Sequence, residues 1–246
     1  MCRFTEPHDP FENHLLAALP SEEYRRLHPA LQPVMFSLGQ VLYEPGGRLD
    51  YVYFPTTAVV SLLYTMEDGS TAEMGLAGND GVVGIALFLG GDTTPNRAVV
   101  QISGHAFRMR AKLLQEEFAR GGALQRSLLR YTQALMTQIS QTGVCNRLHS
   151  VEKRLCRWLL LSHDRVTSDE LLMTQEFIAN MLGGRRESVT VAAGVLQAAG
   201  LIHYSRGHIK ILDRQGLEAT ACECYLIVRN EFHRLLGSAG KTDLTT

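Results

Sequence analysis

The sequence predicts an α+β protein in three parts. These are an N-terminal jelly-roll-like sensor domain (a double-stranded β-helix), a long dimerisation helix and a C-terminal winged helix-turn-helix. Short β-branched and aromatic runs broken by Gly, Pro and Asp come first, an apolar stripe at helical spacing follows, and two short helices hinged at a glycine pair precede an alternating hairpin. The expected segments are an arm (1–18), the β-roll (19–118), the dimerisation helix and hinge (119–146), the winged domain with a C-terminal helix (147–238) and a tail (239–246).

The length and composition are those of an ordinary two-domain protein. The 246 residues carry a net charge of -1, and the five cysteines are an odd, scattered set that does not form a disulfide framework. No apolar run reaches the length of a membrane span, and the N-terminus lacks the basic start and apolar centre of a secretion signal. We therefore expect a cytoplasmic protein with no membrane partner.

The first half contains one short helix and then strands. The arm is expected to be poorly ordered. Residues 19–31 predict a helix capped by Ser21, with Glu22 and Glu23 in its first turn, where acidic groups complement unpaired N–H groups. Evenly spaced short strands then run through residues 34–110, which is typical of a barrel or jelly roll.

A long amphipathic helix follows the strands. Its apolar residues fall at spacings of three and four and so share one side: Leu124, Leu128, Tyr131, Leu135, Ile139 and Thr142. We predict that this stripe is the dimer interface; packing on the β-roll is the alternative. Residues 143–149 predict a bend that acts as the hinge, and Ser150 can cap the next helix, whose apolar face includes Leu155, Trp158, Leu159 and Leu161.

The segment 173–202, MTQEFIANMLGGRRESVTVAAGVLQAAGLI, predicts two helices joined by a tight turn. Thr174 can cap the first helix, Gly183-Gly184 supply the turn, the second helix starts near Arg185, and Gly200 ends it. The predicted buried residues are Phe177, Ile178, Met181 and Leu182 in the first helix and Val189, Ala193 and Leu196 in the second. The opposite side of the second helix is then free to enter a DNA groove.

Basic residues follow the turn and return in the hairpin. Arg185 and Arg186 lie at the positive end of the helix dipole, where a phosphate or guanine explains them better than local stability does. Alternation on both sides of Ser205-Arg206-Gly207-His208 predicts a two-stranded wing, with His208 as a neutral turn residue. The predicted DNA contacts are Thr174, Arg185, Arg186, Glu187, Ser188, Thr190, Arg206 and Lys210.

The charge is unevenly distributed along the chain. Residues 66–96 contain five acidic residues and no lysine or arginine, whereas residues 183–212 contain four basic residues and one acidic one. This pattern is typical of a DNA-binding module attached to a neutral or acidic sensing domain.

The order of β-roll, long helix, hinge and winged helix, with RRESVT opening the second helix, resembles the Crp/Fnr superfamily of bacterial transcription regulators. The resemblance covers about residues 20–225 and is most specific at 174–212. It implies a homodimer on double-stranded DNA, with two recognition helices about 34 Å apart on an inverted repeat. It also implies RNA polymerase as a partner and a signal received by a β-roll that is similar to cyclic-nucleotide-binding domains.

The resemblance assigns base contacts to the start of the second helix. Arg186 matches a family arginine that donates to guanine O6 and N7, and Glu187 matches a glutamate that accepts from a cytosine amine. Where the family commonly has a further arginine, this chain has Val191, which offers only an apolar contact with a thymine methyl.

The β-roll departs from the nucleotide-binding members of the family. Those members hold the ribose and phosphate with a Gly-Glu pair and an Arg-Ser/Thr-Ala run, whereas this chain has Gly84-Ile85 and Asn96-Arg97-Ala98. We therefore do not expect a cyclic nucleotide; a nucleotide-responsive regulator, with a bulge restoring Arg97, is the alternative. The residues that remain candidates for ligand binding are Gly84, Arg97, Ala98 and Ser140.

Metal, cofactor and catalytic sites are not expected. Only Cys2 lies where the oxygen-sensing family branch holds an iron-sulfur cluster, and Cys222 and Cys224 on one helix would point in opposite directions. A redox role for these two, Cys145 or Cys156 stays open. A metal-dependent jelly-roll enzyme using His105 and a cyclic-nucleotide-gated subunit are the rival classes, but no carboxylate or histidine cluster accompanies His105, and the chain lacks a membrane span.

Overall fold

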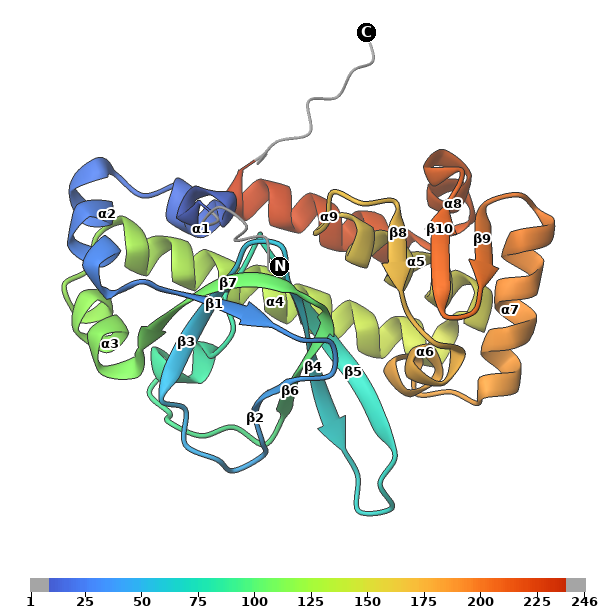
Figure 1. Cartoon of the computed structure of the whole chain (residues 1–246), viewed down its shortest axis with the longest axis horizontal. Coiled ribbons are helices and arrows are strands. Elements are labelled where there is room, and N and C mark those ends of the chain that lie inside the picture. Colours follow the sequence, from blue (N-terminus) through green and yellow to red (C-terminus); the bar gives the residue numbers. More distant parts are fainter. Residues whose placement is uncertain (1–8, 238–246) are drawn as a thin grey trace, which may run out of the picture.

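The computed structural model describes residues 9–237. The β-roll and the winged domain lie side by side, and the long helix α4 runs behind both (Figure 1). None of the helices in residues 9–237 combines the length and apolar character needed to cross a membrane.

Residues 9–18 are folded, which corrects the expected disordered arm; residues 1–8 lie outside the described part. The 3-10 helix η1 (Pro10–Glu12) and helix α1 (His14–Ala17) follow one another, and Leu15 and Leu16 are buried in the core. The Asn13 amide donates to the carbonyls of Pro55 and Gly81 at 2.8 and 2.9 Å, which fixes this segment against the β-roll.

Helix α2 (Ser21–Leu27) and the 3-10 turn η2 (His28–Ala30) precede the strands. Ser21 makes no cap hydrogen bond, since Pro20 occupies the N-cap position. Glu23 instead accepts from the N–H groups of Ala123 and Leu124, both at 2.9 Å, and thereby caps α4. The Ala123 hydrogen bond is the main reason that the pKa of Glu23 lies below its usual value.

The β-roll is a sandwich of two antiparallel sheets, as predicted. One sheet has the order β1-β7-β3 and the other β2-β6-β4-β5. The strands are β1 (Gln32–Phe36), β2 (Val41–Tyr43), β3 (Tyr51–Pro55), β4 (Val59–Thr65), β5 (Thr71–Ala77), β6 (Arg97–Ile102) and β7 (Gly104–Arg110), with the 3-10 turn η3 (Ile85–Leu87) between β5 and β6.

The predicted dimer stripe is buried within the chain itself, so that prediction was wrong. After α3 (Ala111–Ala119), helix α4 (Ala123–Leu148) packs on β5 and α9 (Glu223–Leu236). Five stripe residues are at most 5% exposed and Ile139 is half-buried; the set comprises Leu124, Leu128, Tyr131, Leu135, Ile139 and Thr142. The apolar periodicity correctly indicated that this side of the helix is buried, but the surfaces that cover it belong to the same chain.

The hinge is shorter than the predicted bend. Helix α4 continues through Gly143 to Leu148, and only His149 and Ser150 have extended backbones before α5 (Val151–His163). Ser150 caps α5 as predicted, and the apolar face predicted for α5 is buried.

The C-terminal domain has a three-stranded wing and two closing helices. Its elements are β8 (Glu170–Leu172), α6 (Gln175–Leu182), α7 (Arg186–Ala198), β9 (Ile202–Ser205), β10 (His208–Ile211), α8 (Arg214–Thr220) and α9. The sheet order is β8-β10-β9, so the predicted hairpin gains a third strand. The single C-terminal helix expected from the sequence is instead two helices, because Ala221 and Cys222 adopt extended conformations between α8 and α9.

Helix α5 joins the two domains through buried polar contacts. The Trp158 indole donates to Glu73 of β5 at 2.9 Å, and the Gln101 amide of β6 donates to the Ser162 hydroxyl at 2.8 Å. Burial raises the pKa of Glu73 to about 7, although Ser61 and Trp158 hydrogen bonds and the charges of nearby arginines oppose this shift. The domains therefore share one continuous core.

Candidate nucleic-acid interface

Helices α6 and α7 form the predicted pair. Thr174 accepts a hydrogen bond from the Phe177 N–H at 3.1 Å and caps α6. Gly183 ends α6 with a φ of 60°, a left-handed conformation that favours glycine, and the Gly184 N–H donates to the Ala179 carbonyl at 2.9 Å. The chain reverses within this turn and α7 begins at Arg186.

The residues expected to read bases lie at the exposed start of α7. Arg185 occupies the N-cap position, Arg186 is the first helical residue, and both are exposed, as are Glu187 and Ser188. Val191, one turn after Glu187, is 66% exposed. The outer face of α7 thus presents a cation, a carboxylate and a methyl-bearing side chain, which are groups that can contact base edges in a major groove.

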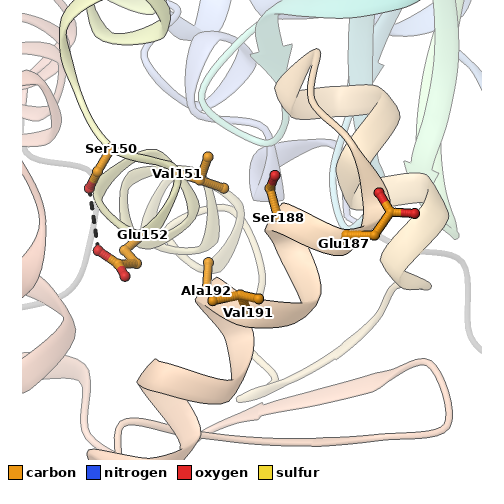
Figure 2. Close-up of a pocket in the computed structure, with 7 residues that line it drawn as sticks. All are labelled: Ser150, Val151, Glu152, Glu187, Ser188, Val191 and Ala192. Carbon is orange, nitrogen blue, oxygen red and sulfur yellow. Dashed lines mark hydrogen bonds between the residues drawn. The ribbon is translucent and has the colours of Figure 1, made fainter.

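An open hollow of about 370 Å³ lies between the start of α5 and this face of α7 (Figure 2). Ser150 and Glu152 line one side, where the serine hydroxyl donates to the carboxylate at 3.4 Å, and Glu187, Ser188 and Val191 line the other. No covering element separates Glu187 from solvent among the described residues, since its side chain is exposed. The hollow leaves this side of α7 accessible.

The predicted DNA-contacting cations are exposed on the surface of the winged domain. Within residues 9–237, no carboxylate forms an ion pair with any of them, namely Arg185, Arg186, Arg206 and Lys210. Arg165, in contrast, is 2% exposed and its Nη2 lies 2.7 Å from Asp80 Oδ2. An exposed cation that pairs with no carboxylate in this part of the chain is available to a phosphate or a base.

The wing lies beside the start of α6. The Met173 N–H donates to the Gly207 carbonyl at 2.7 Å, and Arg206 adopts a φ of 49° at the tip, where its side chain is exposed. His208 is not a turn residue: it begins β10, and its Nδ1 lies 2.7 Å from Glu170 Oε1 of β8. The sequence did not predict β8, because three residues are too few to show the alternation of apolar and polar side chains that indicates a strand.

Two threonines in the predicted set have structural contacts. Thr174 is occupied as the α6 cap, and the Thr190 hydroxyl lies 2.9 Å from Gln175 Oε1, which joins α7 to the first turn of α6. Both side chains are nevertheless exposed.

Arg154 is a connecting residue that the sequence did not reveal. From α5, its Nη2 donates to the Leu182 carbonyl at the end of α6, and its Nε donates to Asn146 of α4 at 3.1 Å. One guanidinium therefore links the long helix, the hinge helix and the helix-turn-helix. A helical arginine next to an apolar stripe gives no sequence signal for such a link.

The residues predicted to hold a ligand do not form one site. Gly84 precedes η3 with a φ of 107°, Ala98 is fully buried, and Arg97 Nε lies 3.0 Å from Glu44 Oε2. Ser140 is exposed on the side of α4 opposite the buried stripe, so it does not face the β-roll of its own chain. A nearby cavity in the β-roll holds about 100 Å³, whereas pockets for small ligands typically measure about 300–1,000 Å³.

The argument against a cysteine chelate was wrong. Helix α9 begins at Glu223, so Cys222 lies before the helix and its side chain is not opposed to that of Cys224. Both belong to a buried group of possible metal ligands with Cys145 and His149. His105 is absent from the one group of this kind found in residues 9–237, and Cys2 lies outside the described residues.

Comparison with known proteins identifies the C-terminal part. The sequence model of the Crp-like helix-turn-helix domain matches residues 153–220. This segment is a Crp-like helix-turn-helix domain. No curated protein sequence matches the chain.

Solved structures show that the rest of the chain has the Crp/Fnr fold. FixK2 from Bradyrhizobium japonicum is 17% identical, covers 78% of this chain and 98% of its own, and gives a TM-score of 0.67. The Crp-family transcriptional regulator TTHB099 from Thermus thermophilus is 18% identical over 76% of this chain and 96% of its own, with a TM-score of 0.64. The c-di-GMP responsive regulator CLP from Xanthomonas campestris is 17% identical over 78% and 99%, with a TM-score of 0.62. A β-roll, a long helix and a Crp-like domain are thus arranged as in transcription regulators of this fold.

Proposed function

We propose that the protein is a homodimeric transcription regulator that binds an inverted-repeat operator through α7 and the wing. The observation that carries this proposal is the set of exposed cations at the start of α7 and on the wing that form no ion pair within residues 9–237. Arg186 would donate two hydrogen bonds to guanine and Glu187 would accept from cytosine, while Arg206 and Lys210 would contact phosphates. The role of RNA polymerase as a partner and the cytoplasmic location remain predictions.

Selection of bound sites from random duplex DNA tests this function. We expect an inverted repeat whose half-sites are centred about one helical turn, roughly 34 Å, apart. Hydroxyl-radical footprinting should then show protection of both half-sites. Protection of one asymmetric half-site by a monomer, or no enrichment of any sequence, would contradict the proposal.

The dimer interface we now propose is the exposed side of α4. Leu129, Met136 and Val144 are 47%, 63% and 46% exposed and recur about every two turns on the face opposite the buried stripe. An exposed apolar seam at this spacing suits pairing with the same helix of a second copy. Ser140 lies on this face, which places it at the proposed interface.

Sedimentation of Met136→Glu tests the interface. A charge at the centre of the seam should convert the dimer into a monomer and weaken binding to the inverted repeat. Met66→Glu is the matched control, because Met66 is 54% exposed outside α4. Dimers of Met136→Glu as stable as those of the control would exclude this surface.

The signal received by the β-roll is not assigned. A cyclic nucleotide is not proposed, since Arg97 is paired with Glu44 and the residue after Gly84 is isoleucine. Whatever binds would act by favouring one arrangement of the winged domain over another. The contacts of α5 with β5 and of Arg154 with α4 and α6 are the connections that such a change would alter.

A further inference from the structure

Three thiols and one imidazole converge where α4 ends and α9 begins. We call this group the thiol–imidazole cluster; its members are Cys145, His149, Cys222 and Cys224. Their ligand atoms all lie within 4.8 Å of one another. Cys145 Sγ is 3.5 Å from Cys222 Sγ, and Cys224 Sγ is 3.6 Å from His149 Nδ1. The cluster has no part in the proposed DNA contacts.

The backbone explains why these four side chains meet. Cys145 and His149 are four residues apart and therefore lie on the same side of the end of α4. Cys222 is extended at the N-cap of α9 and Cys224 is the second helical residue, so the break between α8 and α9 directs both thiols toward α4. All three cysteines are buried, and the His149 side chain is only 15% exposed.

The spacing fits one tetrahedral ion. With metal–sulfur bonds of about 2.3 Å and metal–nitrogen bonds of about 2.0 Å, tetrahedral geometry places neighbouring ligand atoms roughly 3.5–3.8 Å apart. The two short distances in the cluster already lie in this range. An iron-sulfur cluster distributes its ligands over several irons and needs a wider set. Three cysteines and one histidine are a recurrent structural zinc set.

The surroundings support thiolate ligands. His149 Nε2 lies 3.6 Å from Glu223 Oε1, a partner that would orient the ring with Nδ1 toward the thiols. Arg157 lies close to the cluster, since its Nη1 donates to the Thr142 hydroxyl at 3.0 Å, three residues before Cys145. Three thiolates around a divalent ion leave one negative charge, which the guanidiniums of Arg154 and Arg157 would offset.

We propose that the thiol–imidazole cluster binds a single zinc ion as a closed structural site. Four protein ligands leave no open position for catalysis. The ion would cross-link the last turn of α4 to the first turn of α9, directly beside the hinge at residues 149–150, and so limit how far α4 and the winged domain separate.

Metal analysis of the full-length chain tests this site. The protein is purified under reducing conditions, incubated with zinc chloride and desalted. We expect about one zinc per chain in the wild type and in Cys156→Ser, a buried cysteine outside the cluster, but less than about a tenth of that in Cys224→Ser. Equal zinc in Cys224→Ser and the wild type would overturn the proposal, as would wild-type protein that retains none.

A second measurement keeps the test valid if Cys224→Ser does not fold. Cobalt replaces zinc in the wild-type chain, and the expected result is the visible spectrum of a tetrahedral cobalt–thiolate centre, with chelator treatment exposing three further thiols to a thiol reagent. An octahedral cobalt spectrum, or a Cys145–Cys222 disulfide in the reduced preparation found by mass spectrometry, would contradict a zinc site.

Discussion

Arginines in two regions of the molecule differ in how they use their hydrogen bonds. At the contact between the β-roll and α5, Arg165 donates from Nε to Asp80 Oδ1 at 3.0 Å and from Nη1 to the Leu161 carbonyl at 2.7 Å. At the start of α7, Arg186 is exposed and pairs with no carboxylate in the described part of the chain. The same residue type therefore stabilises the fold at Arg165 and remains available to a ligand at Arg186.

The largest expected effect is on stability at the buried site. Arg165→Ala leaves the Asp80 carboxylate without its partner, and we expect a loss of about 3 kcal/mol in the free energy of unfolding, measured in urea. Arg186→Ala should change stability by less than about 0.5 kcal/mol, as is usual for exposed positions. Similar losses for both variants would remove the distinction between the two regions.

The second effect is a pH dependence that arises from Glu73. Its folded pKa of about 7 lies above the ordinary value of 4.5, so its contribution to stability is complete below pH 4.5 and is lost as pH rises through 7. Arg157 and Arg165 act against this shift. Between pH 5 and 8, wild-type unfolding free energy should fall by up to about 3 kcal/mol more than that of Glu73→Gln. Glu67 is an exposed carboxylate between β4 and β5, so Glu67→Gln is the control and should show the wild-type pH dependence. If the unfolding free energy of all three proteins changes equally with pH, Glu73 is ionised in the folded state.

The smallest effect is on DNA backbone binding by the wing. Arg206→Ala should weaken binding to all duplexes by a similar factor and lower the slope of log K against log salt by about one. Arg234→Ala is the control, because Arg234 is also exposed but pairs with Glu231 at 2.7 Å. An unchanged salt slope in Arg206→Ala would exclude a phosphate contact.

The sequence was sufficient to predict those elements whose residue types allow only one local backbone geometry. Thr174 at a cap, Gly183 at a left-handed helix end and alternation around Arg206 specify local geometry, and the helix-turn-helix and wing were predicted from them. The exposed positions of Arg186 and Glu187 follow from the same helical periodicity.

The sequence was insufficient where the partner surface decides the outcome. The Leu128 and Leu135 stripe of α4 would look the same for a dimer interface or for an internal core, and only the fold shows that β5 and α9 cover it. The four ligands of the thiol–imidazole cluster are separated by up to 79 positions, and their convergence depends on an extended residue at Cys222 that interrupts an otherwise helical pattern.

The most direct test of the central claim is the ratio of dissociation constants for a scrambled and a selected duplex, measured at one salt concentration for wild type and Arg186→Ala. The exposed Arg186 is expected to read a guanine, so this ratio should fall about tenfold or more in the variant, while binding to the scrambled duplex changes much less. Equal weakening on both duplexes would contradict a base-reading role for the start of α7.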